Sequence, residues 1–133
     1  MSFVNVPAVI ARANTDGEFQ LHARFWNARL ALVFGAEAQR LTVSHGRMIA
    51  TEAEALDTDA DVTISAAVAD WNALLEPVPR PFYHDLQAAM AHHGFKMNGE
   101  TRHTAAYYPA IRRLIDILRE AHNDVREVRN DNA

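Results

Sequence analysis

The stretch DADVTISAAVADWNALLE, residues 59–76, carries most of the information about the fold of this chain. Residues 62–64 form a short apolar run typical of a strand. Ser65 follows, and its hydroxyl can accept a hydrogen bond from an amide of a first helical turn, so we expect it to be an N-cap. A helix is predicted over 66–75, and its apolar face carries Val68, Trp71, Leu74 and Leu75. A strand therefore leads directly into an amphipathic helix that contains a tryptophan.

Three further strands are predicted before this unit, and the last two of them form a hairpin. Residues 30–34 are a compact apolar run, and residues 40–43 are a second one. A turn containing Gly46 then precedes the return strand over 48–50, as in a hairpin. Residues 16–26 show conflicting signals, because a capping-box spacing favours a helix whereas alternating apolar residues favour a strand. The segment stays undecided between the two, with a lean toward a helix whose N-cap would be Thr15.

Three elements are predicted downstream. Prolines at 77, 79 and 81 end the tryptophan helix. A helix over 82–93 follows, with Gly94 as its C-terminal cap, and then a strand over 95–97. The last helix covers 104–121, and Pro109 means that it either restarts near Tyr108 or is kinked there. Strands followed mainly by helices indicate an α+β domain, with helices covering one face of a largely antiparallel sheet.

Length and composition narrow the class of protein. The 133 residues suit one domain, for which we expect an N-terminal arm over 1–14, a folded domain over 15–121 and a flexible tail over 122–133. The net charge of −4 argues against a nucleic-acid partner. Cysteine is absent, which excludes disulfides and thiolate chemistry. We expect no membrane span, since no apolar run approaches about 20 residues, and a cytoplasmic location.

The polar residues suggest little chemistry. The seven histidines lack the spacing of a metal site, so we expect no metal and no cofactor. Asp85 or Asp70 could form an acid–base pair with a tyrosine or histidine, as in a small α+β isomerase or hydrolase. The donors considered for that pair are Tyr83, Tyr107, Tyr108 and His84. Solvated positions on polar helix faces explain both aspartates better, and the enzyme is kept as an alternative.

Large apolar side chains gather in the second half of the chain. They either fill a core or line a cavity for an apolar small molecule. The candidate ligand-binding residues are Trp71, Leu74, Leu75, Phe82, Leu86, Met90, Phe95, Met97, Tyr107, Tyr108 and Ile111.

Three segments together resemble the SCP2-type sterol-carrier domains. The stretch 59–76 is similar to that family's acidic residue, strand, capping residue and helix with an aromatic and paired leucines. GFKMNGE, residues 94–100, is similar to its final strand, and LALVFGAEAQRLTVSHGRM, residues 30–48, to its preceding hairpin. The resemblance covers roughly residues 28–120. The proline-rich link over 76–81 departs from the family pattern, which puts the equivalence of the helix over 82–93 in question.

The resemblance implies a five-stranded, mostly antiparallel sheet under helices, with an apolar tunnel between the layers. It also implies a carrier of fatty acyl chains, sterols or related lipids, and a family whose members are usually not enzymes. Such a carrier would serve a partner enzyme or act as a homodimer. A structural subunit of a larger complex is a further alternative.

Overall fold

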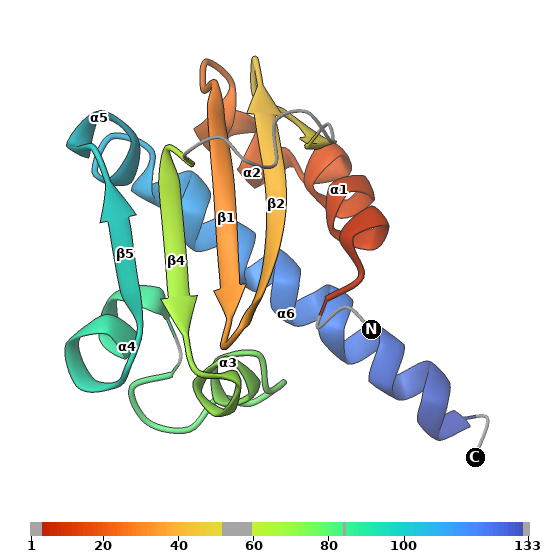
Figure 1. Ribbon diagram of the computed structural model, residues 1–133. Helices are drawn as coiled ribbons and strands as arrows, with labels where there is room; N and C mark the ends of the chain where they lie inside the picture. Colours follow the sequence, from red (N-terminus) through yellow and green to blue (C-terminus); the bar gives the residue numbers. More distant parts are fainter. Residues whose placement is uncertain (1–3, 52–59, 84, 132–133) are drawn as a thin grey trace.

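Five strands form one mixed sheet in the computed structural model, which describes residues 4–51, 60–83 and 85–131 (Figure 1). The strands are β1 (Ala28–Phe34), β2 (Glu37–Ser44), β3 (Arg47–Ala50), β4 (Val62–Ala66) and β5 (Lys96–Gly99). They lie in the order β3-β2-β1-β4-β5. Three neighbouring pairs are antiparallel, and β1 with β4 is parallel. The expectation of an α+β fold with a mostly antiparallel sheet is confirmed.

One face of the sheet is apolar because alternate residues of each strand point to the same side. In β1 the buried residues on this face are Ala28, Leu30, Leu32 and Phe34. Their partners across β2 and β4 extend the face: Leu41, Val43, Val62 and Ile64. The opposite face carries more exposed residues such as Arg29 and Thr42.

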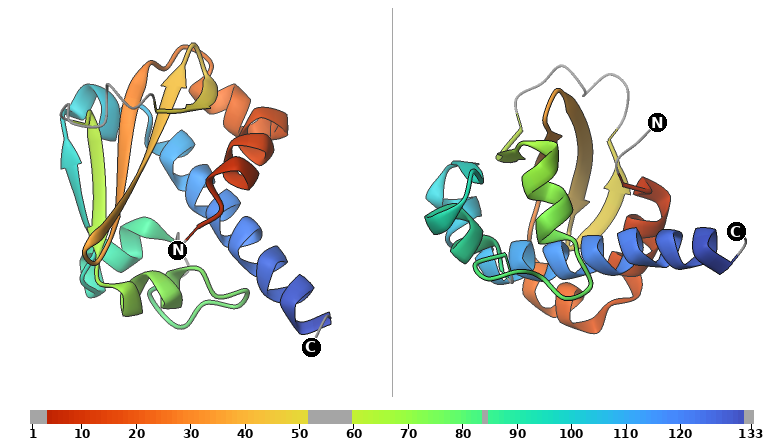
Figure 2. Two further views of the ribbon diagram at one scale, coloured as in Figure 1. Left: turned by 45° about the vertical axis from the view of Figure 1, so that its right-hand side comes forward. Right: turned by 90° about the horizontal axis from the view of Figure 1, so that it is seen from below.

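The helices lie against the apolar face, as predicted (Figure 2). They are α1 (Val6–Thr15), α2 (Gly17–Ala23), α3 (Val68–Leu74), α4 (Leu86–His92), α5 (Thr101–Thr104) and α6 (Tyr108–Asp131). The long helix α6 crosses the sheet diagonally (Figure 1). Its buried stripe is Ala110, Ile111, Leu114, Ile115, Ile117, Leu118 and Ala121. Within the described ranges, no helix is both long and apolar enough to cross a bilayer.

The N-terminal part of the chain is more helical than its sequence pattern indicated. The segment expected to be an arm contains α1, which starts after Asn5, whose side chain accepts a hydrogen bond from the Ala8 amide at 3.1 Å. Pro7 lies in the first turn, where its missing N–H costs nothing. The undecided segment 16–26 contains the helix α2, whose N-cap is Asp16, which accepts from the Phe19 amide at 2.8 Å. The expectation for Thr15 was wrong, because Thr15 ends α1.

Two expected caps in the second half are also wrong. Ser65 lies inside β4, because it pairs with Val33 of β1 and Lys96 of β5, so the strand continues to Ala66. Helix α3 consequently begins later, after Ala67, without a side-chain cap. Gly94 does not end α4 either, because the C-cap is His93 in extended backbone.

The helix expected over 82–93 is shorter than predicted. Its N-cap is Asp85, whose carboxylate accepts from the Ala88 amide at 2.7 Å. Phe82 precedes the helix with a positive φ of 67°, which no helical residue adopts. The strand expected over 95–97 is β5, shifted toward Gly99.

The last helix restarts at Tyr108, which confirms one of the two alternatives for Pro109. Proline occupies the second position of α6, where no intrahelical donor is required. The first part of the predicted segment forms the separate short helix α5. At the other end α6 runs to Asp131, well past the expected end at 121. The division of the chain into arm, domain and tail stays a prediction.

Replacing Gly99 by alanine should destabilise the fold. Gly99 has a φ of +150°, and a Cβ there would overlap the backbone oxygen of Asp61. We expect a loss of about 1–3 kcal/mol in the free energy of unfolding, measured with urea. Gly17→Ala is the control, because nothing lies within 4 Å of a Cβ at that position. Equal stability of both variants would contradict this role of Gly99.

Candidate functional site

Trp71 lies at the centre of the predicted apolar cluster. Its side chain is fully buried, and its indole N–H donates a hydrogen bond to the Val33 carbonyl at 2.8 Å. The Phe34 ring lies 4.5 Å from it between centroids, and the Phe95 ring meets it edge-on at 4.9 Å. One polar bond and two aromatic contacts therefore fix the indole between α3, β1 and the residue just before β5.

The two leucines after Trp71 are held by α6. Arg119 donates from Nε and Nη2 to the Leu74 carbonyl at 3.0 and 2.8 Å. Asn123 donates from Nδ2 to the Leu75 carbonyl at 2.8 Å. These bonds satisfy carbonyls that a helix end leaves without partners. The leucine side chains are fully buried beneath them.

The structure divides the remaining candidate residues into groups. Leu86, Phe95 and Ile111 are buried in the same core, and Met90 and Met97 are partly buried against it.

Tyr107 instead stacks on Trp26, with ring centroids 5.0 Å apart. The Trp26 indole is buried and donates to His103 Nδ1 at 3.0 Å. Sequence analysis overlooked Trp26 because it follows the segment with conflicting helix and strand signals.

Phe82 lies outside the buried cluster. Its side chain is 47% exposed and stacks on His92, with ring centroids 3.8 Å apart. The neighbouring Tyr83 stacks on His93 at 3.7 Å. These two stacked pairs join the proline-rich loop to the end of α4.

The residues of the acid–base alternative have structural contacts. Tyr83 donates its hydroxyl to Asp70 Oδ1 at 2.8 Å, so this pair is brought together. Burial raises the pKa of Tyr83, and the Asp70 carboxylate raises it further, which keeps the proton on the tyrosine. Asp85 uses its carboxylate as the N-cap of α4. His84 lies outside the described residues.

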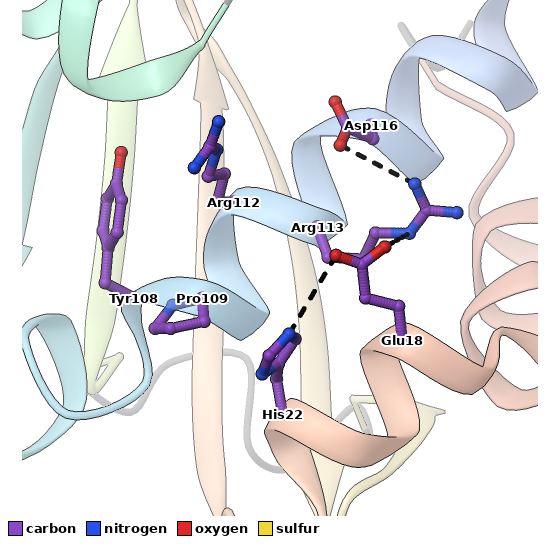
Figure 3. A pocket seen from close by; sticks show the side chains of 7 residues that line it. All are labelled: Glu18, His22, Tyr108, Pro109, Arg112, Arg113 and Asp116. Carbon is purple, nitrogen blue, oxygen red and sulfur yellow. Dashed lines mark ion pairs between the residues drawn. The ribbon is translucent and has the colours of Figure 1, made fainter.

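A separate, polar pocket of about 310 Å³ opens between α2 and the start of α6 (Figure 3). It is lined by Glu18, His22, Tyr108, Pro109, Arg112, Arg113 and Asp116. No group of histidine, aspartate and glutamate side chains in the described ranges could hold a metal ion. Sequence analysis named only Tyr108 of this pocket, as a candidate ligand contact, since the other residues read as ordinary polar helix positions.

Arg113 organises the charges on one side of this pocket. Its Nη2 and Nε bind the two Asp16 oxygens at 2.7 and 2.9 Å. It also lies 3.5 Å from Glu18 and 3.7 Å from Asp116. The hydrogen bond to Arg113 lowers the pKa of Asp16 below its ordinary value, and the Asp16 carboxylate raises the pKa of Arg113. The link between α2 and α6 therefore depends on a charged Asp16.

Comparisons of sequence identify no relatives: no family model matches the chain, and no curated protein does. Comparison of folds is informative. A crystal structure of sterol carrier protein 2 matches with a TM-score of 0.65 and 22% identity, over 91% of this chain and 99% of that one. The solution structure of TT1886 from Thermus thermophilus, described as "possibly sterol carrier protein", matches with a TM-score of 0.61 and 23% identity, over 91% and 90%.

A third structure, described as the UbiJ-SCP2 ubiquinone synthesis protein, matches with a TM-score of 0.53 and 14% identity, over 83% of this chain and 88% of that one. At these identities the similarity shows the fold. The chain has an SCP2-type fold, which confirms the resemblance seen in its sequence.

Replacing Arg119 by alanine should destabilise the region around Trp71. The change leaves the buried Leu74 carbonyl without its two bonds from a charged donor. We expect a loss of about 1.5–3 kcal/mol in the free energy of unfolding, measured with urea. Arg102→Ala is the control, because Arg102 is 72% exposed and pairs only with the equally exposed Glu100 among the described residues. A loss no larger than that of the control would contradict the role assigned to Arg119.

Replacing Asp16 by asparagine should remove part of the acid sensitivity of the fold. Because the folded state lowers the pKa of Asp16, its contribution is present above the unfolded pKa and is lost as pH falls through the folded pKa. Wild type should exceed Asp16→Asn by about 1–2 kcal/mol near neutral pH, and in urea titrations the difference should shrink steadily as pH falls below about 4, the ordinary range of an aspartate. Glu100→Gln, at an exposed ion pair, is the control and should show little difference. A difference for Asp16→Asn that persists in acid would exclude the ion pair as its cause.

Proposed function

We propose that this chain, having the fold of sterol carrier protein 2, is a non-enzymatic carrier or binding module for an apolar small molecule. The observation that carries the proposal is the apolar layer around Trp71, between the sheet and its covering helices, in a chain with this fold. The ligand class is a fatty acyl chain, a sterol or a related lipid. The expected site is a tunnel in this layer.

The chemistry of the layer supports such a ligand. Trp71, Phe34 and Phe95 present aromatic surfaces whose polar atoms are already satisfied or absent. The flexible thioethers of Met90 and Met97 lie at its partly exposed border and can adapt to different apolar shapes. A ligand in this layer would thus be held by dispersion and by the hydrophobic effect, with little demand for a specific polar partner.

Helix α4 is the element best suited to admit the ligand. Only Leu86 and Ala89 among its seven residues are fully buried, whereas α6 buries a continuous stripe. The loop before α4 is held by ring stacking and by the Tyr83–Asp70 hydrogen bond. An element with few buried apolar contacts opens at a low free-energy cost. Displacement of α4 would give access to Leu86 and Met90, with Phe82 at the entrance.

All eleven side chains predicted from the sequence belong to this proposal. Those around Trp71 form its centre: Leu74, Leu75, Leu86, Met90, Phe95, Met97 and Ile111. Phe82 is assigned to the entrance, and Tyr107 and Tyr108 to the start of α6, where Tyr108 lies near Asp85 at the N-terminus of α4. The proposal also includes transfer of the ligand to a partner enzyme, formation of a homodimer and a cytoplasmic location. Size-exclusion chromatography with light scattering measures directly whether the homodimer forms.

Two single-tryptophan variants should locate the ligand. Trp26→Phe leaves Trp71 as the reporter, and Trp71→Phe leaves Trp26, which is also buried. Titration with a fatty acid brominated along its chain should quench Trp71 saturably, because bromine quenches an indole it contacts, and should quench Trp26 less. The unbrominated fatty acid serves as the control for indirect effects.

Mass spectrometry of lipids extracted from the purified protein provides an independent test. Co-purifying lipid supports the proposal. Absence of extractable lipid, together with no saturable quenching in either variant, would overturn it. Quenching confined to Trp26 would move the site away from Trp71 to the opposite end of the layer.

A further inference from the structure

The polar pocket between α2 and α6 adjoins the apolar layer through one side chain. Tyr108 lines the pocket and is also packed against the core. Ala110 and Ile111, two and three residues further along α6, are fully buried in that core. Because Tyr108 separates the two spaces, a molecule with a polar head and an apolar tail could occupy both.

The acidic side chains of the pocket are already paired. Glu18 lies 3.5 Å from Arg113 and 4.0 Å from His22. Asp116 lies 3.7 Å from Arg113 and 3.2 Å from Arg119. Arg113 is in turn bound by Asp16. This network neutralises most of the charge on the side of the pocket that faces α2.

Arg112 is different from these charged neighbours. It is exposed, and it makes no ion pair or hydrogen bond with any residue in the part of the chain that the structure describes. Figure 3 shows its guanidinium and the Tyr108 ring, one turn apart at the start of α6, extending in the same direction and away from the ion-pair network. The pocket thus contains one cation that is available to an anion.

The hydroxyl of Tyr108 is the second polar group on this side. Its oxygen is buried and faces the backbone N–H of Gln87 in α4, which acts to lower its pKa, but its own proton has no acceptor of ordinary geometry among the described residues. Burial raises the pKa of Tyr108, and the nearby Asp85 carboxylate raises it further, so the hydroxyl keeps its proton and can donate. A buried donor without a partner is costly unless another group accepts its hydrogen bond.

We propose that this pocket receives the anionic head group, a carboxylate or a phosphate, of an amphiphilic ligand, with Arg112 as its ion-pairing residue and Tyr108 as a hydrogen-bond donor. The pocket volume of about 310 Å³ is at the lower end of ligand sites, which suits a head group better than a whole lipid. The inference rests on the proposed carrier function, since the tail would extend past Tyr108 into the apolar layer. It names the ligand class as acidic amphiphiles.

The test compares two ligands of equal chain length, dodecanoate and dodecanol, by displacement of a fluorescent fatty acid. Wild type should bind dodecanoate more tightly, and Arg112→Gln should lose roughly threefold to fivefold in affinity for dodecanoate while keeping its affinity for dodecanol. Arg47→Gln is the matched control: Arg47 is an exposed arginine of β3, outside the pocket, also without a partner among the described residues. It should leave both affinities unchanged. Tyr108→Phe should reduce the preference for dodecanoate without lowering the free energy of unfolding.

The outcomes separate this inference from the carrier function. Equal binding of dodecanoate and dodecanol by wild type overturns the head-group site and leaves the carrier proposal intact. A preference for dodecanoate that survives in Arg112→Gln also overturns it. Binding of neither ligand contradicts the carrier proposal itself. NMR titration measures whether acetate or inorganic phosphate binds at Arg112. If either anion binds there as tightly as dodecanoate does, the pocket is a site for a free anion, and the assignment to an amphiphile is wrong.

Discussion

The fold depends on the packing of α6 across the apolar face of the sheet. Every second side chain of β1 presents an apolar surface on this face, and an uncovered surface of that size is unfavourable in water. Helix α6 covers it with a stripe that includes Leu114 and Leu118, both fully buried. Each such side chain contributes about 1.5–3 kcal/mol relative to exposure. This contact joins the first strand of the chain to its last helix.

Polar groups of α6 then position the smaller helices. Arg113 binds the carboxylate that caps α2, and Arg119 with Asn123 binds the carbonyls at the end of α3. Both sets of bonds are directional, so they determine where α2 begins and where α3 ends over the apolar layer, which burial alone leaves less defined. The place of Trp71 follows from this arrangement. Helix α4 is held to α6 less firmly, through the backbone of Gln87 at the Tyr108 hydroxyl rather than through an arginine, which is consistent with its assignment as the entrance.

The two candidate sites use opposite physical properties of the same scaffold. The layer around Trp71 is apolar and has satisfied its few polar atoms, so it can select a ligand only by shape and apolar area. The pocket beside Arg112 is polar and solvent-exposed, so it can contribute recognition of charge but little hydrophobic free energy. An amphiphile is the ligand class that would draw on both. The acid–base alternative gains less support, because Asp70, Tyr83 and Asp85 are all engaged in contacts that hold the loop and α4.

Sequence alone determined those features that depend on neighbours along the chain. Short apolar runs and a glycine-containing turn predicted the strands, and the spacing of Trp71, Leu74 and Leu75 predicted a helix face that is indeed buried. Tertiary structure decided the rest. Ser65 pairs within the sheet instead of capping a helix, because β4 continues alongside β5. No pattern in the neighbouring sequence predicted that β4 pairs with β1 in parallel. Packing separated Tyr107 from Tyr108, and it left Arg112 without a partner beside the pocket. The spacing of apolar residues along the chain indicates which side chains will be buried. Which distant residue each of them contacts depends on the packing of the whole chain, so the sequence pattern does not predict it.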